Sequence, residues 1–183
     1  MTLRIAGLSG STSRPSRTRA LVDMAIGQAA QRFGADAASH DLSDLQPSLG
    51  QAAVLDDFAP LPREIVGAIL SADALVIGTP VYKGSYTGLF KHLFDLIDPA
   101  ALAGKPVLLA ATGGGEKHAL VIEHQLRPLF GFFEAASLPT GIYAGAADFH
   151  DGRPAAPALL ARLDRAVGQF APWLGPARMA DAA

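Results

Sequence analysis

Two runs of apolar residues constrain the fold of this chain more than any other feature. Residues 74–77 (Ala-Leu-Val-Ile) and 107–111 (Val-Leu-Leu-Ala-Ala) carry no polar side chain on either face. Strands that are apolar on both faces are typical of parallel sheets covered by helices on both sides. The two runs therefore predict the central strands of a parallel α/β sheet.

Strand patterns and helical patterns alternate along the rest of the chain. We expect strands at 2–8, 35–41, 73–79, 106–112 and 139–144, and helices at 16–33, 61–71, 85–97, 117–136 and 156–171. Five such units predict a three-layer α/β sandwich around a five-stranded parallel sheet. The segment 43–60 is expected to be irregular. One domain is expected over residues 1–175, followed by a disordered tail over 176–183.

Composition excludes several classes of function. The 183 residues include 15 Lys and Arg, 17 Asp and Glu, and no cysteine, so the formal net charge is −2. Without cysteine there is no disulfide or thiolate chemistry, and the charge argues against nucleic-acid binding. The scattered histidines do not predict a metal site. No apolar run approaches the roughly 20 residues that span a bilayer, and no signal peptide is recognised, so a cytoplasmic location is expected.

A hydroxyl-rich loop follows the first strand and precedes the first helix. A helix N-terminus offers unpaired N–H groups and a favourable dipole to a phosphate group. Charge could come from Arg14 or Arg17, and Ser16 could instead be a simple N-cap in an ordinary polar loop. The candidate phosphate-binding residues are Ser11, Ser13, Ser16, Arg17 and Thr18.

Two further loops follow the two apolar strands. In the first, Pro80 stiffens the turn and Tyr82 could contact an aromatic ring, although a plain strand-to-helix turn is the alternative. In the second, consecutive glycines allow backbone to approach a flat ligand, or form only a flexible turn, or hold the phosphate themselves. The candidate ring-binding residues are Pro80, Val81, Tyr82, Lys83, Ser85, Thr112, Gly113, Gly114 and Gly115.

Strand order 2-1-3-4-5 would bring these three loops to one crevice, because ligands of open parallel sheets bind at the carboxyl ends of the strands. A phosphate site beside an aromatic-ring site predicts a mononucleotide, and FMN is the ligand that we expect.

The loop motifs resemble those of the NAD(P)H-dependent FMN reductases. The resemblance rests on Gly10-Ser11 with Pro15-Ser16-Arg17-Thr18, on residues 79–88 (Thr-Pro-Val-Tyr-Lys-Gly-Ser-Tyr-Thr-Gly), and on residues 111–114. Residues 118–120 and 123–128 are most similar to the reductase components of two-component alkanesulfonate and methanesulfonate monooxygenase systems. The resemblance implies a flavodoxin-like fold, FMN, and hydride transfer from NADPH or NADH. It also implies a flavin-dependent monooxygenase as a transient partner.

In this subgroup the fourth helix carries a π-type insertion at a Tyr or a His, and His124 falls at that position. The resemblance also implies a homo-tetramer, a dimer of dimers, with this helix at the interface. The residues support an interface independently, because the helix 119–133 is apolar around nearly its whole circumference. Pro128 predicts local irregularity near His124. No catalytic acid or base is assigned, and His124 is a candidate modulator.

Two other functions stay open at this point. An FMN-retaining quinone or azo reductase would share the fold, and so would a flavodoxin-type electron carrier. A carrier usually sandwiches its flavin between aromatic side chains, whereas residues 112–117 (Thr-Gly-Gly-Gly-Glu-Lys) contain none. One face of the ring would therefore be open to a nicotinamide, which favours a reductase that exchanges its flavin.

Overall fold

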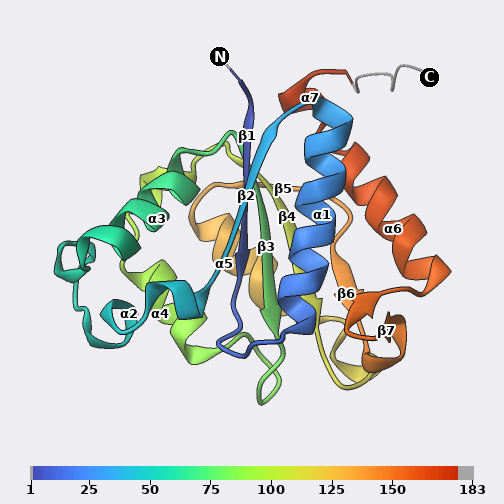
Figure 1. The fold of residues 1–183 in the computed structure, drawn as a ribbon, viewed down its shortest axis with the longest axis horizontal. Coiled ribbons are helices and arrows are strands. Elements are labelled where there is room, and N and C mark those ends of the chain that lie inside the picture. The colour runs from blue at the N-terminus through green and yellow to red at the C-terminus, as the bar shows by residue number, and fades with distance from the viewer. Residues whose placement is uncertain (1, 177–183) are drawn as a thin grey trace.

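The computed structural model describes residues 2–176 and has a parallel sheet at its centre (Figure 1). The strand order is β2-β1-β3-β4-β5, and β6 also pairs with β4. The strands are β1 (Arg4–Ser9), β2 (Asp36–Asp41), β3 (Ala74–Pro80), β4 (Pro106–Thr112), β5 (Ala136–Ser137) and β6 (Ile142–Ala144). The three-layer α/β class and the order of the first four strands are confirmed.

Helices cover both faces of this sheet, and two apolar cores result. On one face, α1 (Arg17–Phe33) and α6 (Pro157–Gly168) pack on strand residues that include Val76 and Leu108. On the other, α3 (Pro60–Ser71), α4 (Gly88–Asp95) and α5 (Arg127–Phe132) pack on residues that include Ile77 and Leu109. Neighbouring residues of one strand thus enter opposite cores, which is why β3 and β4 are apolar throughout.

The expected fifth strand, 139–144, is wrong in its bounds, because two short strands take its place and the sheet has six strands. Both β5 and β6 are parallel to β4. Between them lies Pro139, which has no N–H to donate to a ladder. Gly141 then passes so close to Ile122 that a Cβ would lie 2.6 Å from that side chain. The chain therefore leaves the sheet and returns to it.

The segment 43–60 contains short turns instead of being irregular throughout. They are the 3₁₀ turn η1 (Leu42–Leu45), the single-turn helix α2 (Ser48–Gln51) and the 3₁₀ turn η2 (Leu55–Asp57). Leu42, Leu45 and Leu49 are fully buried in the core. Turns of three or four residues are too short to show a helical periodicity in the sequence. The three buried leucines nevertheless anchor the segment in the core.

The C-terminal part adds a hairpin that the sequence did not predict. Strands β7 (Phe149–His150) and β8 (Arg153–Pro154) are antiparallel, and Asp151 and Gly152 form the turn with φ of 47° and 76°. Positive φ at both central residues is typical of two-residue hairpins. The predicted helix 156–171 corresponds to α6, which ends earlier than expected, at Gly168. A single-turn helix, α7 (Ala171–Leu174), follows it. The predicted tail, apart from residue 176, lies outside the described residues.

The predicted helix 117–136 is divided into three parts. A 3₁₀ turn, η4 (Glu116–His118), precedes a π-helix, η5 (Ile122–Leu126), and α5 continues from it. The wide turn centres on His124, so the expected π-type insertion is confirmed, and Pro128 lies just beyond it. Within residues 2–176, no helix is both long enough and apolar enough to cross a bilayer.

Candidate functional site

A cavity of about 230 Å³ lies at the carboxyl ends of β1, β3 and β4. All three loops singled out in the sequence contribute to it. Its lining residues are Ser11, Ser13, Pro15, Ser16, Arg17, Thr18, Pro80, Val81, Tyr82, Thr112, Gly113 and Gly114. The structure thus brings together every predicted site residue except Lys83, Ser85 and Gly115, and it adds Pro15.

The first loop ends in a capped helix. Ser16 is the N-cap of α1, and its Oγ accepts a hydrogen bond from the N–H of Arg19 at 3.2 Å. A cap satisfies only one of the unpaired N–H groups of the first turn. Among residues 2–176, no group accepts from the N–H of Arg17 or Thr18. Ser16 therefore caps the helix while also lining the cavity, and two helix N–H groups are left beside the cavity for a ligand.

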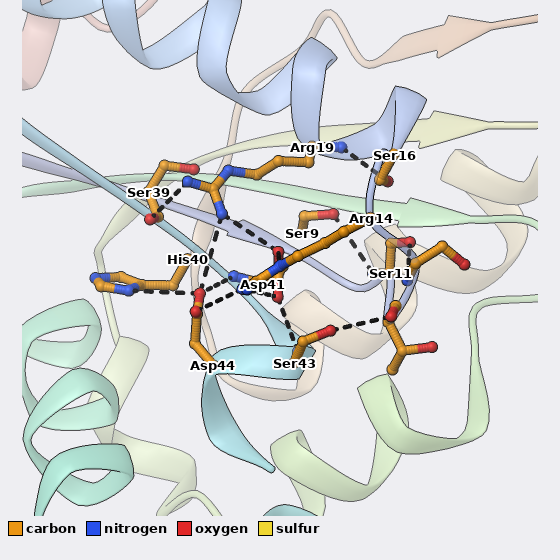
Figure 2. A network of polar contacts seen from close by, with 12 residues as sticks. Ser9, Ser11, Arg14, Ser16, Arg19, Ser39, His40, Asp41, Ser43 and Asp44 are labelled. Atoms are coloured by element: carbon orange, nitrogen blue, oxygen red, sulfur yellow. Dashed lines mark hydrogen bonds and ion pairs between the residues drawn. The ribbon is translucent and has the colours of Figure 1, made fainter. Parts of the chain in front are cut away.

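The charge of the site comes from Arg17, the one charged side chain in the described lining of the cavity. Its Cζ lies 5.7 Å from the centre of the Phe149 ring, at the distance of a cation–π contact. Arg14 has another role (Figure 2), because its guanidinium binds Asp41 through two hydrogen bonds of 2.9 and 2.8 Å. Of the two arginines proposed from the sequence, Arg17 is the one available to a phosphate.

The second loop is a tight two-residue turn. Tyr82 and Ser85 exchange backbone hydrogen bonds of 2.9 and 3.2 Å, and Lys83 and Gly84 form the tip with φ of 53° and 84°. The Ser85 hydroxyl donates to Gln125 Oε1 at 3.1 Å, in the π-helix. Lys83 and Ser85 consequently lie outside the cavity lining, whereas the Tyr82 side chain is 54% exposed beside it.

The third loop is shaped by Tyr143, a residue that the sequence analysis missed. Its hydroxyl donates to the carbonyl of Gly115, and a Cβ on Gly113 would lie 2.2 Å from that hydroxyl. Burial raises the pKa of Tyr143, so the hydroxyl keeps the proton that it donates. A Cβ on Gly114 would meet no atom within 4 Å. A side chain at Gly113 would therefore displace the Tyr143 hydroxyl, whereas Gly114 leaves open space at the cavity.

Two more contacts join the loops to one another. The Thr87 hydroxyl, at the N-terminus of α4, donates to the carbonyl of Gly10 at 2.9 Å. Gly10 in turn donates its N–H to Gly78, and a Cβ on Gly10 would lie 2.7 Å from Phe90. The backbone of the first loop is thus fixed against β3 and α4, which preorganises the cavity.

The chemistry of the lining suits a phosphorylated aromatic ligand. Hydroxyls, free helix N–H groups and one guanidinium lie on one side, and a proline, a valine, a tyrosine and bare glycine backbone lie on the other. No group of three metal-ligating side chains occurs within residues 2–176. A 2-1-3-4 strand order with a ligand cavity at the switch point between β1 and β3 defines a flavodoxin-like α/β protein.

Comparison with known proteins identifies the family. The model of the NADPH-dependent FMN reductase family matches residues 3–150. An FMN reductase (NADPH) of Pseudomonas aeruginosa is 46% identical over 94% of this chain and 92% of the relative. The NADH-dependent FMN reductase SfnF of Pseudomonas fluorescens is 47% identical, with the same coverage. The crystal structure of an oxidoreductase from Corynebacterium diphtheriae is 36% identical, with a TM-score of 0.83 over 94% of this chain and 97% of that one.

The chain belongs to the NADPH-dependent FMN reductase family. It is an oxidoreductase, and its cofactors are FMN and a nicotinamide nucleotide. The two Pseudomonas relatives are almost equally similar to it and differ in their coenzyme, so overall identity does not select between NADPH and NADH.

Proposed function

We propose that this chain transfers hydride from NADPH or NADH to FMN that is bound in the cavity between the three loops. The observation that carries the proposal is the convergence of those loops on one cavity, whose described lining holds one charged side chain, Arg17. In this proposal Ser11, Ser13, Ser16, Arg17 and Thr18 hold the phosphate. The ring is framed by Pro80, Val81, Tyr82, Lys83, Ser85, Thr112, Gly113, Gly114 and Gly115, with Lys83, Ser85 and Gly115 supporting it from outside the cavity lining.

FMN supplies the chemistry of the reaction, because its N5 accepts the hydride. The residues of the chain bind and orient it. Arg17 and the first N–H groups of α1 place the phosphate, and the rigid turn after Pro80 places backbone beside the ring. No aromatic side chain occurs in residues 112–117. The glycine loop therefore leaves one ring face accessible to a nicotinamide.

We further propose that reduced FMN leaves the site and serves a sulfonate-type monooxygenase. The described lining offers one cation and one tyrosine, a modest set of contacts that suits a flavin that exchanges. An FMN-retaining quinone or azo reductase is the second candidate, and a flavodoxin-type carrier the third. We place the reaction in the cytoplasm, where the nicotinamide nucleotides that it consumes are regenerated.

We also propose that the chain forms a homo-tetramer, a dimer of dimers. Leu120 and Phe132 are 62% and 70% exposed on either side of the π-helix. A cavity of about 610 Å³ lies beside Phe132 and is lined by residues of α4, the π-helix and α5, including His124. Phe130 and Phe133 are buried within the chain. An exposed aromatic ring in the lining of a large groove, with an exposed leucine on the preceding turn, supports contact with a second copy.

Steady-state turnover tests the proposed function. With catalytic protein and excess NADPH or NADH, added free FMN should be reduced over many turnovers, and the rate should saturate with FMN. The purified protein should lose yellow colour on dialysis. Retained flavin, fast turnover with a quinone and no response to free FMN would identify the quinone or azo reductase. Slow oxidation of NADPH and NADH, with either FMN or a quinone as acceptor, would identify the electron carrier.

A further inference from the structure

Asp41 lies at the carboxyl end of β2 and is only 1% exposed. Its carboxylate accepts both hydrogen bonds of the Arg14 fork, the N–H of Ser43 at 2.9 Å, and Arg19 at 3.3 Å. A bidentate arginine–carboxylate pair fixes geometry as well as charge. A carboxylate this deeply buried and fully engaged is a rigid anchor, in contrast to an exposed ion pair.

The two arginines that Asp41 holds lie on either side of the phosphate-binding segment. Arg14 precedes Pro15 and Ser16, and Arg19 follows Arg17 and Thr18 in the first turn of α1. Figure 2 shows both guanidinium groups directed at the same carboxylate. Asp41 therefore joins the two ends of the segment 15–18, all of which lines the cavity.

Two more contacts hold the part of the loop that precedes this segment. The Ser43 hydroxyl donates to the carbonyl of Thr12 at 3.0 Å, and Asp44 accepts from Arg14 at 2.6 Å (Figure 2). Thr12 and Arg14 flank Ser13, which lines the cavity. Residues 41–44 thus fix the loop from outside, and none of them lines the cavity itself.

The ion pairs of Asp41 and Asp44 also determine which arginine is available to the phosphate. Arg14 pairs with Asp41 and Asp44, and Arg19 pairs with both of them and with Asp23, so neither guanidinium offers an unbalanced positive charge to the loop. We propose that Asp41 is a positioning residue for phosphate binding: it holds Arg14 outside the site and fixes the loop so that Arg17 and the helix N–H groups meet the phosphate. This inference rests on the proposed function, because it takes the phosphate to be that of FMN.

The test compares FMN with riboflavin, which has the same ring and lacks the phosphate. Dissociation constants for both flavins are measured by flavin fluorescence for the wild type, for Asp41→Asn and for Asp164→Asn. Asp164 provides the matched control, since it forms an exposed ion pair with Arg32, between α6 and α1. Thermal unfolding is recorded for each protein.

Asp41→Asn should weaken FMN binding at least about tenfold, because a displaced loop would lose a charged hydrogen bond to the phosphate, and tenfold in affinity corresponds to ~1.4 kcal/mol. Riboflavin binding should change less than about twofold, since riboflavin has no phosphate and makes no such bond. Asp164→Asn should leave both constants unchanged. If Asp41→Asn does not fold, Ser43→Ala should show the same selective loss to a smaller degree.

Equal weakening of both flavins, or no change in either, would overturn the proposal, because a general structural role moves both constants together. Tighter FMN binding in Asp41→Asn would also overturn the proposal. It would show that Asp41 only keeps Arg14 away from the phosphate and does not fix the loop for binding. Failure of the proposed function is a separate outcome, since it is seen in the wild type, which would then reduce neither flavin.

Discussion

Thr18 and Thr112 are 94 residues apart in the chain, and their buried hydroxyl oxygens lie 2.6 Å from each other. One belongs to the first turn of α1 and the other to the end of β4. Their hydrogen bond therefore joins the first turn of α1, where we propose that the phosphate binds, to the start of the glycine loop. Thr18 is 2% and Thr112 is 6% exposed, so each hydroxyl has little access to water in place of its partner.

Thr112→Val should lower the free energy of unfolding by about 1–3 kcal/mol, because it leaves the Thr18 hydroxyl buried without its partner. The double variant Thr18→Val with Thr112→Val should recover part of that loss, since both polar groups are then removed. Chemical denaturation of the two single variants and the double variant measures the coupling. Strictly additive losses would contradict a shared hydrogen bond.

Arg17→Ala should weaken FMN binding by at least about 1.5 kcal/mol, the lower range for a hydrogen bond to a charged group. Riboflavin binding should stay unchanged, and Arg165→Ala, in the last turn of α6, provides a matched control. Titration calorimetry with both flavins measures the difference. An unchanged dissociation constant for FMN would remove Arg17 from the phosphate site.

Phe149→Leu should weaken FMN binding less than Arg17→Ala does. Phe149 supports the guanidinium through a cation–π contact, which is worth about 0.5–1 kcal/mol at an exposed site. The combined variant should be no weaker than Arg17→Ala alone, because Phe149 acts only through Arg17. An additive loss in the combined variant would show that Phe149 contacts the flavin directly.

Gly114→Val and Gly113→Ala should fail in different ways. At Gly114 a Cβ meets open space, so the valine variant should unfold cooperatively at nearly the wild-type temperature and bind no flavin. At Gly113 even a Cβ would overlap the Tyr143 hydroxyl, so the alanine variant should lose stability. Thermal unfolding and FMN binding, measured on both variants, separate the two roles. Normal FMN binding by the valine variant would mean that the ring lies elsewhere.

The layers of the fold and the three site loops could be predicted because they depend on local patterns. Apolar runs on both strand faces, a hydroxyl-rich loop before a helix, and consecutive glycines can each be read within a few residues. The parallel order then brings the carboxyl ends together without further information. The division of the fifth strand depends on packing of Gly141 against Ile122, a contact between distant segments.

Three residues that the sequence analysis missed, Asp41, Tyr143 and Phe149, share one property: each contacts a group remote in sequence. Asp41 holds an arginine 27 residues away, and Tyr143 binds a carbonyl 28 residues away. Asp41 had a local signal, because a polar residue at the carboxyl end of a strand is placed near the ligand. For Phe149 the signal was absent, since its contact with Arg17 depends on the hairpin of β7 and β8.

Acid should destabilise the wild type more than Asp41→Asn. Burial by itself favours the neutral acid, but the hydrogen bonds from Arg14 and Ser43 and the charges of Arg14 and Arg19 outweigh it, so the pKa of Asp41 is lowered. A lowered pKa contributes stability that is complete above about pH 5 and is lost as the pH falls below about 4 toward the folded-state value. Unfolding temperatures measured between neutral and acid pH should therefore converge for the two proteins at the acid end. Parallel curves would show that Asp41 has no linked proton.

Phe132→Glu should dissociate the proposed tetramer. Its ring is 70% exposed at the rim of the groove beside His124, and a buried carboxylate without a partner strongly disfavours association. Val54→Glu is the matched control, because Val54 is also more than half exposed but lies in the segment before α3. Light scattering at micromolar concentration should give a tetramer for the wild type and for Val54→Glu, and a smaller species for Phe132→Glu. A monomeric wild type, or a Phe132→Glu protein that stays tetrameric, would place the interface elsewhere or remove it.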